Sequence, residues 1–164
     1  MTNAYFQHLF KSPVGELTLI AHDKALCALL WKGDGETRAK FPKEIPRDPK
    51  HPILKKATEQ LTEYFRGTRR TFDLPLEPMG TDFQTKVWKV LRTIPFGKRL
   101  AYSEQAARLG DRKKARAVGA ANGKNPISII VPCHRVVGKN GSLTGFGGGL
   151  GVKKFLLDFE AKNL

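Results

Sequence analysis

A cysteine and a histidine stand side by side at positions 133 and 134, inside the stretch Pro-Cys-His-Arg-Val-Val. The mostly apolar residues 127–131 precede them and predict a buried strand that carries Cys133. A buried thiol stays protonated and unreactive unless a neighbouring base removes its proton, and His134 is the candidate base. The pair therefore indicates either an activated nucleophile or an ordinary core cysteine beside a core histidine, which is the commoner case.

The charge of the chain is concentrated in its C-terminal half. The 164 residues carry 29 Lys and Arg against 15 Asp and Glu, a net charge of +14. Residues 80–164 hold 16 basic and 5 acidic side chains, a net of +11. Such a field indicates a polyanionic partner, either nucleic acid or an anionic membrane. Without an apolar stretch of about 18 residues or a signal peptide, the sequence favours a cytoplasmic protein that binds nucleic acid and not membrane.

The cysteine and histidine spacing predicts neither a disulfide framework nor a metal site. The only cysteines are Cys27 and Cys133, and the four histidines are scattered along the chain. Cys27 lies in the apolar run 25–31 and is interpreted as a core residue. We expect both thiols to be reduced, and we expect no metal and no cofactor.

Residues 1–79 predict a small α+β domain. Apolar residues alternate near 6–10 and 17–21 and continue through 25–31, with turn residues between them, which is typical of an antiparallel meander. Residues 33–52 are rich in charge and proline and predict a loop, and residues 53–65 show the apolar spacing of a helix. No arrangement of side chains in this half suggests catalysis.

Residues 80–164 predict a second, mostly helical domain. Residues 74–80 contain two prolines and a glycine and are interpreted as the linker. Thr81 and Gln84 have the spacing of a capping box at the start of a helix. The last helix is expected over 152–161, with apolar side chains facing inward at Phe155, Leu156 and Phe159.

Two short helices are expected between these elements, as a helix-turn-helix. Ser103 can cap a helix over 104–109 that Gly110 ends, and Asp111 can cap a second helix over 112–121. Two helices joined by a tight glycine turn are a common DNA-binding unit.

The second of these helices has small side chains where a base-reading helix needs long polar ones. Small residues let a helix backbone approach a narrow minor groove, which favours binding with little sequence preference. Arg116 is the one long side chain on this face and could enter the base stack where a nucleotide is displaced. A solvated basic helix, packed through its alanines, is the alternative interpretation.

Together these residues resemble the O6-alkylguanine-DNA alkyltransferases, proteins that repair alkylated DNA in a single turnover. The resemblance covers essentially all of residues 80–164, and residues 12–15 with the following strand are similar to the ribonuclease H-like N-terminal domain of bacterial members. The most specific part is the Cys-His block. The other matching residues are Phe83-Gln84, Val87-Trp88, residues 94–97, Tyr102-Ser103, residues 115–119, Asn125-Pro126 and Glu160.

The resemblance implies an irreversible alkyl transfer from O6-alkylguanine in double-stranded DNA to the sulfur of Cys133. His134 is implied to act through a water as the base, and Glu160 to orient and charge-stabilise His134. Asn125 is implied to hold the turn before Cys133 and to hydrogen-bond the relay. Glu160 also lies in an otherwise apolar helix, where an unpaired carboxylate would be costly.

The DNA contacts are likewise implied by resemblance. Tyr102 would contact the DNA backbone and the flipped base, Arg116 would fill the gap that the base leaves, and the carbonyl groups of Cys133 and Val136 would accept from the guanine amino group. Residues 145–149 would close the pocket around O6. The further implied contacts are Ser103, Ala117, Gly119, Phe146, Gly147 and Gly148.

Three positions depart from the family pattern. Family members often have tyrosine at position 146 and serine or alanine at 147, where this chain has Phe146 and Gly147, and some have proline in place of Ser128. These replacements predict a roomier pocket that accepts alkyl groups larger than methyl. O4-alkylthymine is a second candidate substrate, and a monomer is expected.

Three rival functions belong to other classes. A DNA-binding regulator with a structural or sensor cysteine should prefer a DNA sequence and form a dimer, and the small residues of the second helix argue against both. A cysteine hydrolase with a Cys-His-Glu triad would not account for the charge of residues 80–164. A non-catalytic alkyltransferase-like protein would lack the reactive cysteine, which is present here as Cys133.

Overall fold

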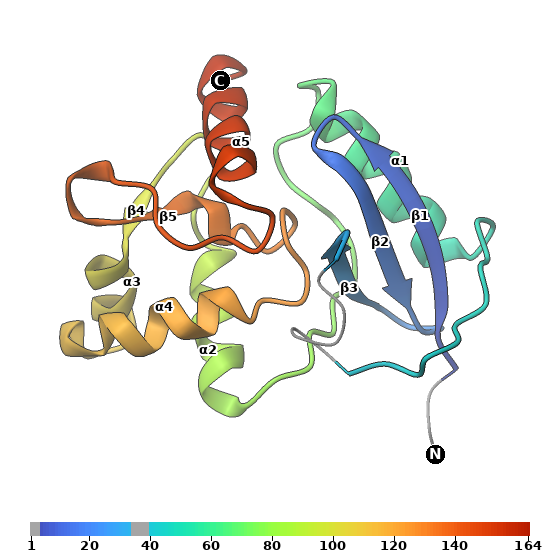
Figure 1. Ribbon diagram of the computed structural model, residues 1–164, viewed down its shortest axis with the longest axis horizontal. Coiled ribbons are helices and arrows are strands. Elements are labelled where there is room, and N and C mark those ends of the chain that lie inside the picture. Colours follow the sequence, from blue (N-terminus) through green and yellow to red (C-terminus); the bar gives the residue numbers. More distant parts are fainter. Residues whose placement is uncertain (1–3, 34–39) are drawn as a thin grey trace.

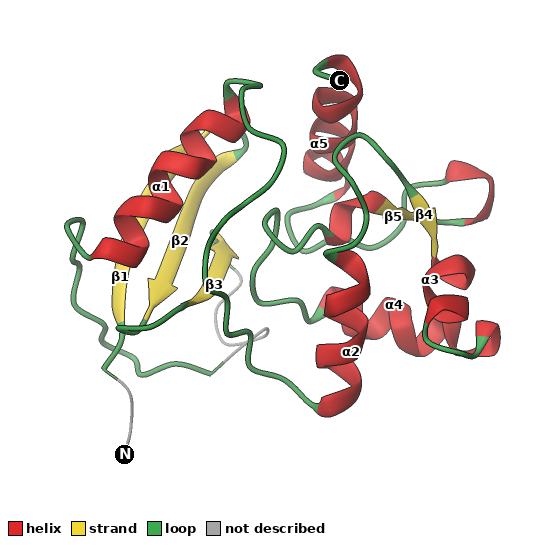
Figure 2. Ribbon diagram, turned by 180° about the vertical axis from the view of Figure 1, so that it is seen from behind, coloured by secondary structure: helices red, strands yellow, loops and turns green. Residues whose placement is uncertain are grey.

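The computed structural model describes residues 4–33 and 40–164 (Figure 1). A three-stranded sheet and one long helix form the N-terminal part, and a group of shorter helices forms the C-terminal part (Figures 1 and 2). This confirms the predicted α+β fold class. In the described part of the chain, no helix is long and apolar enough to cross a membrane.

The N-terminal sheet is the predicted antiparallel meander. It consists of β1 (Phe6–Ser12), β2 (Gly15–Ala21) and β3 (Leu26–Trp31), in that order. Gly15, at the turn between β1 and β2, has a φ of +108°, a conformation that favours glycine. Helix α1 (Pro52–Phe65) packs across one face of the sheet, with Leu54, Leu61 and Tyr64 fully buried (Figure 2).

The segment between β3 and α1 lacks regular structure where the structure describes it, as predicted for 33–52. Residues 34–39 of that predicted loop lie outside the described residues. In the remainder, Arg47 forms an isolated bridge with Gln7 of β1.

The C-terminal part contains four α-helices in the described residues. Helix α2 (Asp82–Leu91) begins with the predicted capping box, because Thr81 Oγ1 accepts from Gln84 N and Gln84 Oε1 accepts from Thr81 N. The others are α3 (Tyr102–Arg108), α4 (Ala115–Gly123) and α5 (Leu150–Lys162). Two-residue strands β4 (Leu100–Ala101) and β5 (Val136–Val137) pair in parallel.

Helices α3 and α4 form the predicted pair, but both begin differently from the prediction. Ser103 is not a cap: α3 starts at Tyr102, and Glu104 Oε1 accepts from Ala101 N at 3.0 Å. The glutamate reaches one of the otherwise unpaired amides of the first turn, so a capping serine is not needed. Residues Arg112–Lys114 form a separate 3₁₀ turn ahead of α4, in which Asp111 accepts from Lys113 N at 2.9 Å.

The angle between these helices is fixed by buried polar contacts. Gln105 and Asn122 exchange two amide hydrogen bonds of 2.9 and 2.8 Å between α3 and α4. Trp88 Nε1 of α2 donates to the carbonyl of Ala121 at 2.8 Å. Because a buried amide left unpaired costs about 1–3 kcal/mol, these bonds favour a single arrangement of the three helices.

Helix α5 turns a different face inward from the predicted one. Leu156 is buried as expected, but Phe155 is 41% exposed and Phe159 is only partly buried. Lys153, Leu157 and Glu160 share the buried face with Leu156. The two polar side chains find buried partners, and this tertiary pairing overrides the apolar pattern.

Backbone contacts join the two parts of the chain along β3. Leu29 N donates to the carbonyl of Pro126 at 2.9 Å, and Leu29 and Ile127 form a parallel bridge. The segment that leads to Cys133 therefore continues the edge of the N-terminal sheet.

Candidate active site and DNA-facing groove

Cys133 lies on a tight bend at the end of a buried segment. Residues 127–131 are all buried, and Cys133 is 6% exposed. Ile129 has a φ of +72°, a rare conformation for a β-branched residue and one that clusters at functional sites. The expected strand is wrong, because Cys133 belongs to the 3₁₀ turn Cys133–Arg135. Pro132, which has no N–H to donate, interrupts any strand pairing just before it.

His134 faces the carboxylate of Glu160, on α5. The imidazole is fully buried, and its Nε2 lies 2.7 Å from Glu160 Oε2. Because an ionised carboxylate can only accept, Nε2 carries the proton and Nδ1 keeps its lone pair. In the part of the chain that the structure describes, Nδ1 of His134 is a buried side-chain nitrogen without a hydrogen-bond partner. The ring therefore presents a basic nitrogen on the side opposite Glu160.

Burial lowers the pKa of His134 below its ordinary value. Hydrogen bonding and charge attraction from Glu160 oppose this shift, while the positive charges of Arg135 and Lys153 add to it. The imidazole is consequently neutral at neutral pH, which is the protonation state that a general base requires.

The Glu160 carboxylate is saturated with donors. It accepts five hydrogen bonds, from Tyr64 Oη, Gly97 N, His134 Nε2 and two nitrogens of Arg135, at 2.6 to 3.1 Å. Burial alone would raise its pKa, but the hydrogen bonds from His134 and Arg135 and the positive charge of Arg135 hold the pKa of Glu160 well below its usual range. Glu160 is therefore a permanent buried anion.

Sequence reasoning missed Arg135 and Tyr64 as partners of Glu160. The signal for Arg135 is its place in the buried Cys-His block, since a buried guanidinium needs a carboxylate or several carbonyl groups. Its Nη1 also donates to the carbonyl of Ile94 at 2.7 Å. Tyr64 gives no such signal, because it lies 96 residues from Glu160 and in the other half of the chain.

Lys153 is a second buried cation that the sequence pattern did not reveal. Its Nζ donates to the carbonyl groups of Val136 at 2.6 Å and Thr144 at 3.0 Å, and lies 5.8 Å from the centre of the Tyr102 ring. Burial lowers the pKa of Lys153, and a thiolate at Cys133 would oppose that shift. Lys153 thus joins β5 to Thr144, just before the glycine-rich loop (residues 145–149), and occupies one lone pair of the Val136 carbonyl.

Asn125 holds the backbone ahead of Cys133. Its Nδ2 donates to the carbonyl of Val131 at 2.8 Å, and its Oδ1 accepts from Ile127 N at 3.0 Å. These two bonds close the turn between α4 and the Cys133 segment. The implied hydrogen bond to the relay stays a prediction.

An open groove of about 690 Å³ runs between the helix pair and the glycine-rich loop. It brings Tyr102, Arg116 and Gly119 together with residues 144–147, although they come from separate parts of the sequence. A Cβ at position 119 would lie 3.6 Å from the Tyr102 ring, in ordinary van der Waals contact, so Gly119 leaves that space in the groove open. The predicted contacts Ser103, Ala117, Val136 and Gly148 lie outside the lining of this groove, and so does Cys133.

The glycine-rich loop rests on the N-terminal sheet through Trp31 of β3. The Trp31 ring packs edge-on against Phe146, with ring centres 5.5 Å apart, and its Nε1 donates to Ser128 Oγ at 3.0 Å. A Cβ at Gly148 would come within 2.9 Å of the Trp31 ring. The N-terminal part therefore supports the glycine-rich loop through Trp31. Sequence reasoning had considered only residues 145–149 themselves at this place.

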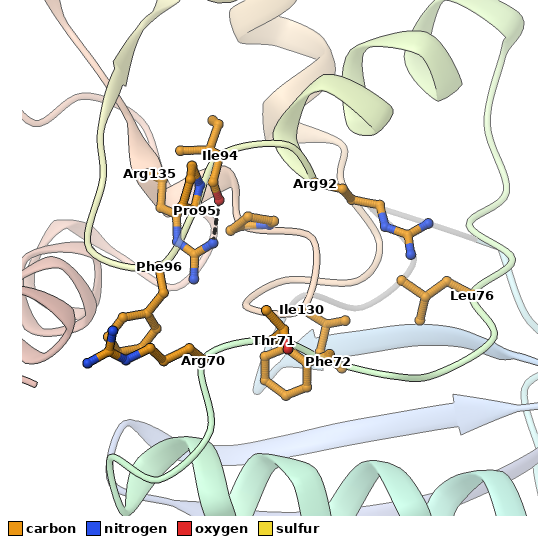
Figure 3. A pocket seen from close by; sticks show the side chains of 11 residues that line it. Arg70, Thr71, Phe72, Leu76, Arg92, Ile94, Pro95, Phe96, Ile130 and Arg135 are labelled. Carbon is orange, nitrogen blue, oxygen red and sulfur yellow. Dashed lines mark hydrogen bonds between the residues drawn. The ribbon is translucent and has the colours of Figure 1, made fainter. Parts of the chain in front are cut away.

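A separate cavity of about 160 Å³ lies behind the Cys133 turn, between the two parts of the chain (Figure 3). Its walls include Phe96, Pro132 and Arg135, and Figure 3 shows Arg135 reaching across to the carbonyl of Ile94. The guanidinium groups of Arg70 and Arg135 lie 5.7 and 5.8 Å from the centre of the Phe96 ring. This packing holds the Arg135 guanidinium against the Phe96 ring.

Cys27 lies beside two other groups that sequence reasoning did not connect with it. Cys27, His22 and Glu77 place one potential ligand atom each within 4.8 Å of one another, and His22 contacts Glu77 directly. Burial raises the pKa of Cys27 to about 11, so its thiol is protonated at neutral pH. This agrees with the interpretation of Cys27 as a core residue, and the absence of a metal stays a prediction.

The buried imidazole makes the folded state sensitive to acid. The pKa of His134 is lower in the folded chain than its unfolded value of about 6.5, and that of Glu160 is lower than about 4.3. The unfolded chain therefore binds more protons in acid, so stability should fall as the pH drops below about 6.5 and again below about 4.3. Urea unfolding between pH 7.5 and 5 should show a shallower loss for His134→Gln than for the wild type. Parallel curves would remove His134 as the source.

Comparisons with known proteins match nearly the whole chain to one protein family. Residues 5–78 match the family model for the ribonuclease-like domain of 6-O-methylguanine DNA methyltransferase, and residues 82–162 match the model for its DNA-binding domain. A methylated-DNA–protein-cysteine methyltransferase from Methanosarcina mazei is 45% identical over 97% of this chain and 99% of its own length. A protein of the same name from Mycobacterium tuberculosis is 46% identical over 91% and 88%.

Solved structures give the same result. The M. tuberculosis O6-methylguanine methyltransferase superimposes with a TM-score of 0.87 at 42% identity, covering 98% of this chain and 94% of that one. The structure of the M. tuberculosis protein in complex with DNA has a TM-score of 0.85 at 44% identity, covering 97% and 93%.

Proposed function

Because the chain belongs to the O6-methylguanine DNA methyltransferase family and acts in DNA repair as a methylated-DNA–protein-cysteine methyltransferase, we propose that Cys133 is the sulfur that accepts the alkyl group. The observation that carries this proposal is the buried relay beside it. His134 is neutral, is held by an ionised Glu160, and directs an unpaired Nδ1 away from that carboxylate. Cys27 also lies near a histidine and a carboxylate, His22 and Glu77, but Glu77 is exposed and burial raises the pKa of Cys27 to about 11.

In the proposed reaction the thiol proton of Cys133 passes through a water to Nδ1 of His134. The thiolate attacks the alkyl carbon, so a sulfur–carbon bond forms while the bond from that carbon to O6 of guanine breaks. The guanine leaves with the electron pair of the broken bond and takes up a proton. Glu160 stabilises the imidazolium that forms in the first step, as in other activated nucleophiles. The thioether product is stable, so each molecule reacts once.

We assign the DNA surface to the groove and to the helix pair beside it. The 3₁₀ turn Arg112–Lys114 is exposed and can contact phosphates, and the small residues Ala117 and Gly119 on α4 suit a minor groove. Tyr102 and Ser103 at the start of α3 would contact the backbone and the displaced base. Phe146, Gly147 and Gly148 would lie over it.

The Val136 carbonyl would accept from the guanine amino group with the lone pair that Lys153 leaves, since a carbonyl oxygen has two. Asn125 would support the relay through the turn that it closes. We assign the DNA and alkyl-transfer chemistry to residues 80–164 and a supporting role to residues 1–79, in a monomer that acts in the cytoplasm on O6-alkylguanine in duplex DNA.

Replacing Arg116 by alanine should slow repair of duplex DNA. The side chain is exposed and lines the groove, where it can fill the gap left by a displaced base. We expect about a tenfold weaker affinity for a lesion duplex and a slower transfer rate, with the rate on the free base O6-benzylguanine unchanged. Equal rates of wild type and variant on duplex DNA would exclude this role. Lys55→Ala, exposed on α1 and away from the groove and the helix pair, is the matched control for loss of one positive charge.

The proposal is tested by locating the transferred group. The protein is incubated with a duplex oligonucleotide that carries one O6-methylguanine, digested and examined by peptide mass spectrometry. We expect a gain of one methylene unit in the peptide that contains Cys133 and none in the peptide that contains Cys27. A label on Cys27, or on no cysteine, would contradict the proposal.

A further inference from the structure

Tyr64 links the N-terminal part of the chain to the relay. It lies on α1, and its hydroxyl donates to Glu160 Oε2 at 2.6 Å. The same oxygen accepts from His134 Nε2 at 2.7 Å. The tyrosine and the imidazole therefore share one acceptor atom, although they come from different ends of the chain.

The Tyr64 ring has little freedom to move. It is fully buried, and its centre lies 5.0 to 5.9 Å from those of Phe65, Phe72, Phe96 and Phe159. Burial, followed by the negative charge of Glu160, raises the pKa of Tyr64 well above its ordinary value. The hydroxyl therefore stays neutral and acts on the carboxylate as a fixed donor.

We propose that Tyr64 is a positioning residue that sets the basicity of His134 through the oxygen they share on Glu160. This inference rests on the proposed function, because it gives the N-terminal part a role in activating Cys133. A donor on Oε2 withdraws negative charge from it, so the carboxylate holds an imidazolium less strongly. Tyr64 thereby helps to keep His134 neutral and ready to accept a proton.

Other charged groups around the imidazole of His134 also raise or lower its pKa. Glu160 favours the imidazolium, while Arg135 on the same turn and Lys153 on α5 disfavour it. Arg135 binds both carboxylate oxygens, and Gly97 N donates to Oε1 at 3.1 Å. Cys133 is the residue directly before His134 in the sequence. Loss of the Tyr64 hydroxyl leaves these groups in place, so its effect on His134 can be measured separately.

The test is the pH dependence of single-turnover methyl transfer from the O6-methylguanine duplex. Tyr64→Phe retains the ring and removes only the hydroxyl. We expect the acid limb of the maximum transfer rate to move to higher pH by about one unit, because the imidazolium is better stabilised, with DNA affinity unchanged. A limb that coincides with that of the wild type would overturn the inference.

Two controls separate this role from a structural one. Tyr5→Phe removes a hydroxyl from the same half of the chain, where it contacts Met79, and should leave the limb in place. Phe159→Leu loosens the aromatic cluster but keeps the Tyr64 hydroxyl, and should lower stability without moving the limb. If Phe159→Leu moves the limb as far as Tyr64→Phe does, packing and not the hydrogen bond is responsible.

Failure of the inference can be distinguished from failure of the proposed function. If His134→Gln transfers at the wild-type rate, or the wild type has no acid limb, the relay itself is wrong. If Tyr64→Phe folds too poorly for kinetics, the imidazole pKa of His134 can be followed by NMR at low temperature. An upward shift in the variant supports the inference, and an unchanged pKa overturns it.

Discussion

Replacement of Cys133 by alanine is expected to abolish alkyl transfer while leaving affinity for lesion DNA within about twofold of the wild type. In the proposed reaction the sulfur of Cys133 forms the new bond to the alkyl carbon, so its removal leaves no acceptor. The thiol is small and buried at the end of a rigid turn, so its loss should cost only about 1 kcal/mol of stability. Transfer is measured with a radiolabelled methyl group and binding by fluorescence anisotropy.

Cys27→Ala is the matched control for this experiment, because Cys27 is equally buried but lies in β3. It should transfer the methyl group at the wild-type rate. Residual transfer by Cys133→Ala would show that another atom is the acceptor. Loss of DNA binding in the same variant would show that the turn, and not only the chemistry, had changed.

Glu160→Gln is expected to reduce both stability and the transfer rate. The carboxylate neutralises Arg135 in a buried site through hydrogen bonds of 2.8 and 3.0 Å. Removing one member of such a pair leaves a buried charge uncompensated, which costs about 3–5 kcal/mol. Urea unfolding at neutral pH measures this loss. Transfer should slow by at least tenfold, because the imidazolium loses its stabilising charge, while DNA affinity should change little.

The double variant Glu160→Gln with Arg135→Met separates the buried charge from the relay. Without the guanidinium, no uncompensated charge remains, so at least half of the lost stability should return while transfer stays slow. Lys154→Ala disrupts an exposed pair with Asp158 on the same helix and should change stability by less than about 0.5 kcal/mol. Full stability in Glu160→Gln, or a wild-type transfer rate, would contradict the assigned role.

The sequence predicted those structural features that depend on residues close together in the chain. The meander, the capping box of α2 and the glycine turn between the paired helices follow from patterns within about ten residues. Burial of Cys133 follows from the apolar residues ahead of it. The expected cap at Ser103 was wrong because Glu104 reaches the same end of the helix, and short-range patterns do not decide between two such residues.

The inward face of α5 shows a different limit. By hydrophobicity alone, Phe155 belongs inside and Lys153 outside, and the structure has the reverse. The lysine is buried because the carbonyl groups of Val136 and Thr144 meet it there. Neither carbonyl belongs to the helix. The helix sequence therefore cannot reveal the partners that compensate for the desolvation of the buried charge.

The sequence by itself determined which atoms we assign to the chemistry, because Cys133 and His134 are neighbours and the basic charge lies in the same half of the chain. Only the tertiary structure decided the electrostatic state of that chemistry. Tyr64, Arg135 and Glu160 meet across 96 residues of sequence. The pKa of a buried group depends on desolvation and on charges a few ångströms away, and those distances exist only in the folded chain.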